Sequence, residues 1–205
     1  MTLTSRVYSL IVSDVTDGCY RTCLPLFPPS ARVLDVGIGN GEMLRKYHET
    51  IRARRLSITG LDIDRDYLEQ CNRLIGEYSL QEHIHTEFTP VEEYTPPSAG
   101  YFDIILFSMS FMLLTDPRRV LRRIRPWLAE NGQVVFIQTM FAKASRLLEL
   151  VKPRLKYVTT IDFGRVIYEQ DFLRLLQMED FLIVEDRLIA RKWFGGQCRM
   201  VRARA

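Results

Sequence analysis

The sequence has 205 residues, of which 47% are hydrophobic and 26% charged, and its formal net charge is +3. That length predicts one α/β domain over residues 1–205, and the composition is typical of a globular protein with a full core. The longest apolar run, residues 104–114, is interrupted by Ser108 and Ser110 and is too short to cross a bilayer, and the first fifteen residues do not resemble a signal peptide, so we expect a soluble, cytoplasmic protein.

Short apolar runs alternate with helical patterns from residue 32 onward, which predicts a mostly parallel sheet with helices on both faces. The expected strands are residues 32–36, 56–61, 83–88, 102–107 and 133–138, with helices between them. Asp64 and Asp116 are placed to cap the helices that follow them. Pro126 should kink or end the helix that Pro117 begins.

The last third of the chain departs from this alternation. The stretch between the fifth strand and a helix at residues 170–177 is far longer than an ordinary connection, so residues 139–168 are interpreted as a lid-like insertion. Its first half, residues 142–155, has an amphipathic pattern. Residues 181–190 and 197–205 then predict a closing hairpin.

A glycine-rich loop joins the first strand to the first helix, with the sequence Asp35-Val36-Gly37-Ile38-Gly39-Asn40-Gly41. Glycines let the backbone turn sharply and approach a ligand, and the following helix start presents free amide groups to a carboxylate or phosphate. Glu42 stands where a dinucleotide site requires glycine, and the Gly-Lys-Ser/Thr of a phosphate-binding P-loop is missing.

A second acidic residue, Asp62, ends the second strand about twenty residues beyond the loop. A carboxylate at this point can accept both hydroxyls of an adenine ribose, and Ile63 can lie against the purine. The alternative is a turn or capping aspartate, a role that Asp64 fills better.

These segments resemble the motifs of class I S-adenosylmethionine-dependent methyltransferases, over roughly residues 32–136. The glycine loop is similar to the first motif and Gly60-Leu61-Asp62-Ile63-Asp64 to the second. Residues 102–108 and 131–136 resemble the fourth and fifth. The resemblance implies a doubly wound, seven-stranded Rossmann-like sheet with an antiparallel last strand, and S-adenosylmethionine as the cofactor.

The resemblance also implies which residues bind that cofactor. Asp35, Gly37 and Gly39, with Asn40 in the same loop, would hold its methionine half, while Asp62 and Ile63 would hold ribose and adenine. Val91 and Glu92 would lie at the adenine edge, and Phe107 and Ser108 beneath the reactive methyl group. Where many relatives have an acid before the position of Val91, this chain has Pro90.

The methyl acceptor is expected to be a small molecule that attacks through nitrogen or oxygen. Residues 107–110 lack the Asn/Asp-Pro-Pro-aromatic run with which similar enzymes act on nucleic-acid amino groups, so a nucleic acid is disfavoured. None of the three histidines lies at the carboxyl end of a strand, so the acceptor would be positioned in line rather than activated. The positioning candidates are Tyr8, Ser108, Tyr157, Asp162 and Tyr168.

Two other interpretations stay open at this point. A protein or lipid methyltransferase would use the basic amphipathic residues 142–155 as its docking surface. A non-catalytic assembly protein could keep the same fold and cofactor. A metal site is not expected: Cys19 and Cys23 are four residues apart, but no further ligands with zinc spacing accompany them. The sequence does not indicate an oligomeric state.

Overall fold

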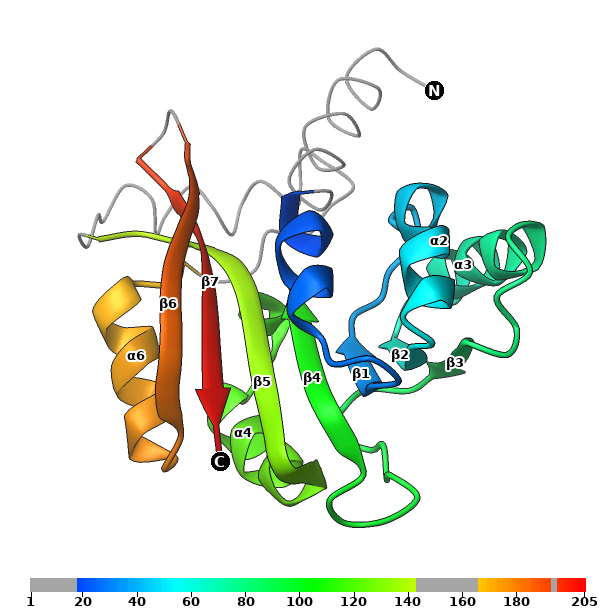
Figure 1. Ribbon diagram of the computed structural model, residues 1–205. Helices are drawn as coiled ribbons and strands as arrows, with labels where there is room; N and C mark the ends of the chain where they lie inside the picture. Colours follow the sequence, from blue (N-terminus) through cyan, green and yellow to red (C-terminus); the bar gives the residue numbers. More distant parts are fainter. Residues whose placement is uncertain (1–17, 143–165, 193–194) are drawn as a thin grey trace.

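The computed structural model describes residues 18–142, 166–192 and 195–205, which form one seven-stranded sheet in the order β3-β2-β1-β4-β5-β7-β6 (Figure 1). The strands are β1 (Arg32–Val36), β2 (Ser57–Asp62), β3 (Ile84–Phe88), β4 (Phe102–Ser108), β5 (Leu128–Met140), β6 (Leu182–Arg191) and β7 (Gln197–Arg204). The first five run parallel, whereas β7 is antiparallel to both of its neighbours. The predicted doubly wound sheet with an antiparallel last strand is confirmed.

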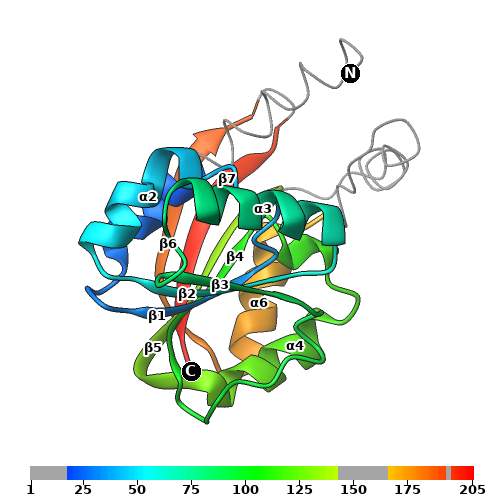
Figure 2. The same cartoon turned by 90° about the vertical axis from the view of Figure 1, so that its right-hand side faces the viewer.

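Helices cover both faces of this sheet (Figure 2). They are α2 (Leu44–Ala53), α3 (Arg65–Glu77), α4 (Pro117–Ile124) and α6 (Glu169–Met178), with single 3₁₀ turns at Leu24–Leu26, Phe111–Leu113 and Arg125–Trp127. Residues 18–23 are also helical and pack with α2 and α3 in one hydrophobic core, while α4 and α6 contribute to the core on the opposite face. The structure therefore has three layers.

The predicted helix caps are present. The Asp64 carboxylate accepts a hydrogen bond from the Tyr67 amide, and the Asp116 carboxylate accepts one from the Arg119 amide. Each satisfies an amide group that the first turn of a helix leaves free. The helix that starts at Pro117 ends at Ile124, just before Pro126, as expected from the missing amide hydrogen of proline.

The fifth strand is longer than predicted at both ends. It begins at Leu128, which pairs with Phe102 of β4 before the register shifts, and it continues to Met140. Thr139 and Met140 pair with β7 and are buried, so these two residues belong to the strand and not to the predicted insertion. This pairing joins residues far apart in sequence, and local periodicity does not report it.

The arginines of α4 face acidic residues at the end of α6. Arg118 and Arg122 both bind the carboxylate of Glu179, which is buried, and Arg125 lies 3.3 Å from Asp180. We call Arg118, Arg122 and Glu179 the α4–α6 corner. Among the described residues, no helix is long and apolar enough to span a membrane.

Candidate functional site

Three of the predicted site residues end neighbouring strands on one edge of the sheet. Asp35 lies near the end of β1, Asp62 ends β2 and Ser108 ends β4. Asp35 is paired in register with Gly60 of β2 and with Leu106 of β4. Because all three strands are parallel, their carboxyl ends converge where open α/β sheets bind ligands.

The glycine loop between β1 and α2 is held in a conformation that side chains disfavour. Gly37 has a φ of +80° and Gly39 a φ of +66°. A Cβ atom on Gly37 would lie 2.6 Å from the Cβ of Ser110, whose hydroxyl donates to the Val36 carbonyl. A Cβ on Gly39 would meet no atom of the described residues within 4 Å. The loop is therefore packed tightly at Gly37 and open at Gly39, where a ligand has room.

Asp62 is fixed by the backbone on both sides. One carboxylate oxygen accepts from the Gly39 amide at 2.8 Å, and the other accepts from the Asp64 amide at 2.9 Å. Each carboxylate oxygen can accept a second hydrogen bond, so two acceptors stay available for two adjacent hydroxyls. Ile63, the next residue, is 71% exposed and presents an apolar surface to solvent. This pair fits a ribose and a flat base.

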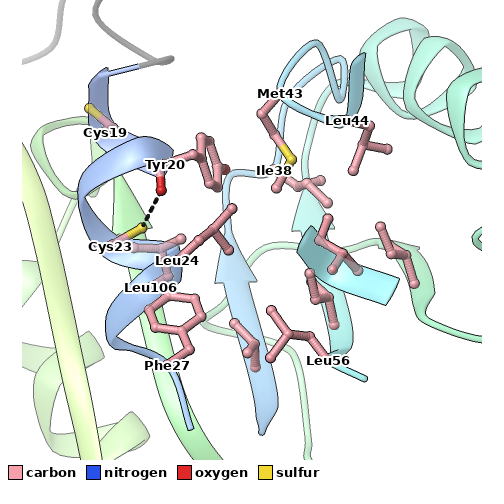
Figure 3. Packing of buried hydrophobic residues seen from close by; sticks show 14 of the residues in the cluster. Cys19, Tyr20, Cys23, Leu24, Phe27, Ile38, Met43, Leu44, Leu56 and Leu106 are labelled. Carbon is pink, nitrogen blue, oxygen red and sulfur yellow. Dashed lines mark hydrogen bonds between the residues drawn. The ribbon is translucent and has the colours of Figure 1, made fainter. Parts of the chain in front are cut away.

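Asp35 is buried beneath the loop. The Tyr20 hydroxyl donates to its Oδ2 at 2.7 Å. Tyr20 comes from the helical residues 18–23, which pack in one hydrophobic core with residues of the sheet; Figure 3 shows this core without Asp35. The Oδ1 of Asp35 is also buried and has no hydrogen-bond partner among the residues that the structure describes. Burial raises the pKa of Asp35 to about 7, opposed by the hydrogen bond from Tyr20 and assisted by the charge of Asp62.

The unpaired Oδ1 makes Asp35 suited to a cationic ligand. A buried polar atom without a partner is uncommon in native proteins, and at a ligand-binding edge it indicates a group that arrives with the ligand. An ammonium group would supply both the missing donor and the missing positive charge. Asp35, the space at Gly39 and Asp62 together match the ammonium and ribose of S-adenosylmethionine, so the described residues fit that cofactor.

The remaining predicted cofactor residues lie nearby but contribute differently. Asn40 accepts from the Glu42 amide through its side chain and so shapes the loop. Val91 and Phe107 are buried in the core, where Phe107 stacks on Phe136. Glu92 is half-buried in the turn after β3.

Of the positioning candidates for the acceptor, Tyr8, Tyr157 and Asp162 lie outside the described residues. Tyr168 is half-buried at the start of α6, next to the end of β5, where it forms a parallel bridge with Phe141. Ser108 ends β4 and is half-buried. The structure thus brings Ser108 to the same edge as Asp35 and Asp62.

The three histidines have contacts away from this edge. His48 lies within 3.0 Å of the Leu44 carbonyl and stacks on Tyr78, and His83 contacts the Leu56 carbonyl. His85 is exposed beside Glu87. The sequence likewise placed none of the three at the carboxyl end of a strand.

Sequence reasoning missed two residues that shape the site. Tyr20 holds Asp35, and Ser110 fills the space beside Gly37. The buried residues of the segment before β1 recur at helical spacing, namely Cys19, Tyr20, Cys23, Leu24 and Phe27. That stripe would have placed Tyr20 against the sheet, although it would not have identified Asp35 as its partner.

The cysteines show no arrangement for a metal. All four are buried thiols without a disulfide. Among the described residues, no group of three or more histidine, cysteine, aspartate or glutamate side chains could hold a metal ion.

Residues 17–185 match a family model described as a methyltransferase domain. A malonyl-[acyl-carrier protein] O-methyltransferase of Halalkalibacterium halodurans is 23% identical over 151 residues, which cover 66% of this chain and 53% of the relative. The chain spans about half the length, or less, of the curated relatives that it matches.

Solved structures share the fold. The [4+2]-cyclase SpnF superposes with a TM-score of 0.70 at 15% identity, covering 93% of this chain and 80% of its own. Geranyl diphosphate C-methyltransferase from Streptomyces coelicolor, solved with S-adenosyl-L-homocysteine, gives a TM-score of 0.68 at 13% identity, covering 87% of this chain and 73% of its own. At these identities the likeness concerns the fold alone.

Proposed function

Because the chain belongs to the methyltransferase-domain family, we propose that it transfers a methyl group from S-adenosylmethionine to a small-molecule acceptor through nitrogen or oxygen. The cofactor of this family supplies an electrophilic methyl group on sulfur. The observation that carries the proposal is the pair of strand-end carboxylates beside an open glycine: Asp62 is fixed by the Gly39 and Asp64 amides, and Asp35 keeps one oxygen unpaired.

In this proposal the chain binds and orients, and it needs no metal. Asp62 accepts the two ribose hydroxyls, Ile63 covers one face of the adenine, and Gly39 gives the amino-acid part room. Glu92 and the backbone at Val91 lie at the adenine edge, while Phe107 and Ser108 support the end that carries the methyl group. Holding the acceptor in line with the methyl group and excluding water lowers the barrier through proximity, and a histidine base is not required.

The acceptor would enter beside the end of β5. Tyr168 and Ser108 are the described positioning candidates there, and Tyr8, Tyr157 and Asp162 complete the proposed set. We propose that residues 141–168 form the roof of the acceptor pocket, within one domain that covers the whole chain. A small-molecule acceptor agrees with the name of geranyl diphosphate C-methyltransferase, whereas the O-methyltransferase relative is named for a malonyl group on a carrier protein.

The test has a binding part and a transfer part. Calorimetry should show one S-adenosylhomocysteine bound per chain with micromolar affinity. Methyl-labelled S-adenosylmethionine, incubated with the protein and a metabolite extract, should then label a small molecule. Tyr168→Phe should slow that transfer several-fold and leave the affinity for S-adenosylhomocysteine within twofold. Failure of the wild-type protein to bind S-adenosylhomocysteine would refute the proposal.

A second candidate deserves a place in the same assay, because one structural neighbour is named a cyclase. Fold alone does not determine the reaction. A protein that binds S-adenosylhomocysteine but labels no component of metabolite, protein or lipid fractions would favour a cofactor-binding protein with another role. Label in the protein or lipid fraction would instead show that the methyl acceptor is a protein or a lipid.

A further inference from the structure

Tyr20 and Asp35 form a buried pair, and the proposed function so far gives Tyr20 no role. Tyr20 is 2% exposed, and its hydroxyl lies 2.7 Å from Oδ2 of Asp35, fifteen residues later in the chain. The ring packs in the same hydrophobic core as Ile38 of the glycine loop and Met43 at the start of α2 (Figure 3). Because the hydroxyl is the polar end of an otherwise apolar contact, its position fixes the orientation of the Asp35 carboxylate.

The hydrogen bond from Tyr20 gives the two oxygens of the Asp35 carboxylate different surroundings. Oδ2 is occupied by Tyr20, whereas Oδ1 is buried and has no partner among the described residues. A change in the orientation of the carboxylate plane would break the hydrogen bond from the Tyr20 hydroxyl, so this bond opposes such a change. One oxygen is therefore kept free at a constant position next to the glycine loop.

The surroundings of Asp35 contain acids and thiols. The titratable groups that interact with it are Tyr20 and Cys23 on the helical residues 18–23, Asp62 on β2 and Cys71 on α3. No basic side chain of the described residues contributes to the pKa of Asp35. A cationic ligand at Oδ1 would thus supply a positive charge that none of the described side chains supplies.

We propose that Tyr20 is a positioning residue of the cofactor site: by holding Oδ2 of Asp35, it leaves Oδ1 to accept the α-ammonium group of the cofactor. This inference rests on the proposed function. It assigns Tyr20 a part in recognising the amino-acid half of the ligand and none in recognising the nucleoside half, which Asp62 and Ile63 hold.

The pair also makes recognition depend on pH. An ammonium group binds the ionised carboxylate, so protonation of Asp35 competes with the cofactor. With the pKa of Asp35 near 7, affinity should fall about tenfold from pH 8 to pH 6. The hydroxyl of Tyr20 favours the ionised form and lowers this pKa. Its removal should move the midpoint of the binding profile to higher pH.

The experiment compares two ligands that differ only in the amino-acid half. Affinities for S-adenosylhomocysteine and for 5′-methylthioadenosine are measured by calorimetry from pH 6 to pH 8.5. Tyr20→Phe should lower the affinity for S-adenosylhomocysteine five- to tenfold at pH 7 and raise the midpoint of its pH profile. The affinity for 5′-methylthioadenosine should stay within twofold of the wild-type value. Tyr94→Phe, which removes a hydroxyl from another buried tyrosine, should change neither ligand.

Three other results are informative. Equal weakening of both ligands by Tyr20→Phe, or no weakening of either, would overturn the proposal. Asp35→Asn, which needs no change at Tyr20, should give a flat pH profile for S-adenosylhomocysteine, and a profile like that of the wild type would overturn it as well. Wild-type protein that binds neither ligand would instead refute the proposed function.

Discussion

Two buried carboxylates in this protein have opposite surroundings. Glu179, at the α4–α6 corner, is 6% exposed and binds two guanidinium groups, and the hydrogen bond from Arg122 is the main cause that lowers its pKa. Asp35, at the proposed cofactor site, is 1% exposed, faces Tyr20 and another acid, and has its pKa raised to about 7 by burial. Among the described residues, two arginines neutralise Glu179, whereas no ion pair includes Asp35.

This difference in surroundings suggests that Glu179 contributes to stability and Asp35 to ligand binding. A buried charge with good partners holds two elements together, while a buried charge without one destabilises the protein that carries it. Proteins retain such uncompensated groups mainly at functional sites, where a ligand supplies the partner. Glu179 therefore predicts effects on unfolding, and Asp35 and its neighbours predict effects on ligand affinity. Substitutions in the two regions test this division.

The largest effect should come from closing the open space at the cofactor edge. Gly39→Val places a branched side chain where no atom now lies within 4 Å, in a loop with a φ of +66°. Affinity for S-adenosylhomocysteine should fall more than about 100-fold because the side chain occupies the ligand's volume, a loss of about 2.7 kcal/mol or more. Calorimetry measures this.

Gly132, near the start of β5, is the matched control. A Cβ there would lie 2.9 Å from backbone atoms of Ala129 and Phe102. Gly132→Ala should lower the melting temperature without changing affinity per folded molecule. If Gly39→Val lowered stability as much as Gly132→Ala and still bound the ligand, the space at Gly39 would not be the cofactor site.

Removal of the ribose acceptor should come next. Asp62→Ala should weaken S-adenosylhomocysteine by about 1.5–3 kcal/mol, the usual worth of hydrogen bonds to a charged group. It also frees the Gly39 amide, so part of the loss would come from a looser loop. Asp64→Ala is the control, since it removes a helix cap from α3 and should lower stability by about 1 kcal/mol with little effect on affinity. Unchanged affinity in Asp62→Ala would remove Asp62 from the site.

Substitutions at the α4–α6 corner should change the free energy of unfolding and not ligand affinity. Glu179→Gln should lower the free energy of unfolding by about 1–2 kcal/mol at pH 7, because Arg118 and Arg122 are partly exposed and keep some hydration. The pKa of Glu179 is lowered, so its contribution is complete above the ordinary glutamate range and is lost as pH falls through the lowered value. Urea unfolding at pH 7 and pH 3 should show the difference shrink.

Asp180→Asn provides the comparison for that corner. Asp180 is 78% exposed in its pair with Arg125, and exposed pairs contribute little. A change in unfolding as large as that of Glu179→Gln would mean that burial of the carboxylate is not what matters. Neither variant should alter S-adenosylhomocysteine affinity.

More of the proposed cofactor site than of the α4–α6 corner could be predicted from the sequence. Asp35, the glycines and Asp62 could be found because their chemistry is local: each ends a strand or forms the turn that follows it. Helix caps at Asp64 and Asp116 were predictable for the same reason. The partner of the α4 arginines could not be found from a local pattern, because Glu179 lies 57–61 residues further along the chain.

Two other features depended on contacts that no local pattern encodes. The early start of β5 comes from the pairing of Leu128 with Phe102, which sheet register decides. Tyr20 was part of an apolar stripe, yet only the packing of that helical segment on the sheet brings its hydroxyl to Asp35. Tyr8 was the aromatic that resemblance suggested ahead of the glycine loop, and it lies outside the described residues.

The smallest effect, and the sharpest test of the comparison, is a gain in stability at Asp35. The folded pKa of about 7 lies above the unfolded value near 4, so the native state holds the extra proton between these values and stability falls as pH rises through that window. Above pH 7 the wild type carries the full penalty of a buried charge.

Asp35→Asn removes the charge and keeps an acceptor for Tyr20. It should therefore raise the free energy of unfolding of the ligand-free protein at pH 8, by about 1 kcal/mol rather than the roughly 4 kcal/mol that three pKa units represent, because the amide hydrogens of the asparagine are buried in place of the unpaired oxygen. No gain is expected at pH 4, where Asp35 is already protonated. Urea unfolding of both proteins at the two pH values measures this, and Glu179→Gln should change stability in the opposite direction at pH 8. A loss of stability in Asp35→Asn at pH 8 would show that the protein already compensates this carboxylate. The contrast between the two regions would then rest on Glu179 alone.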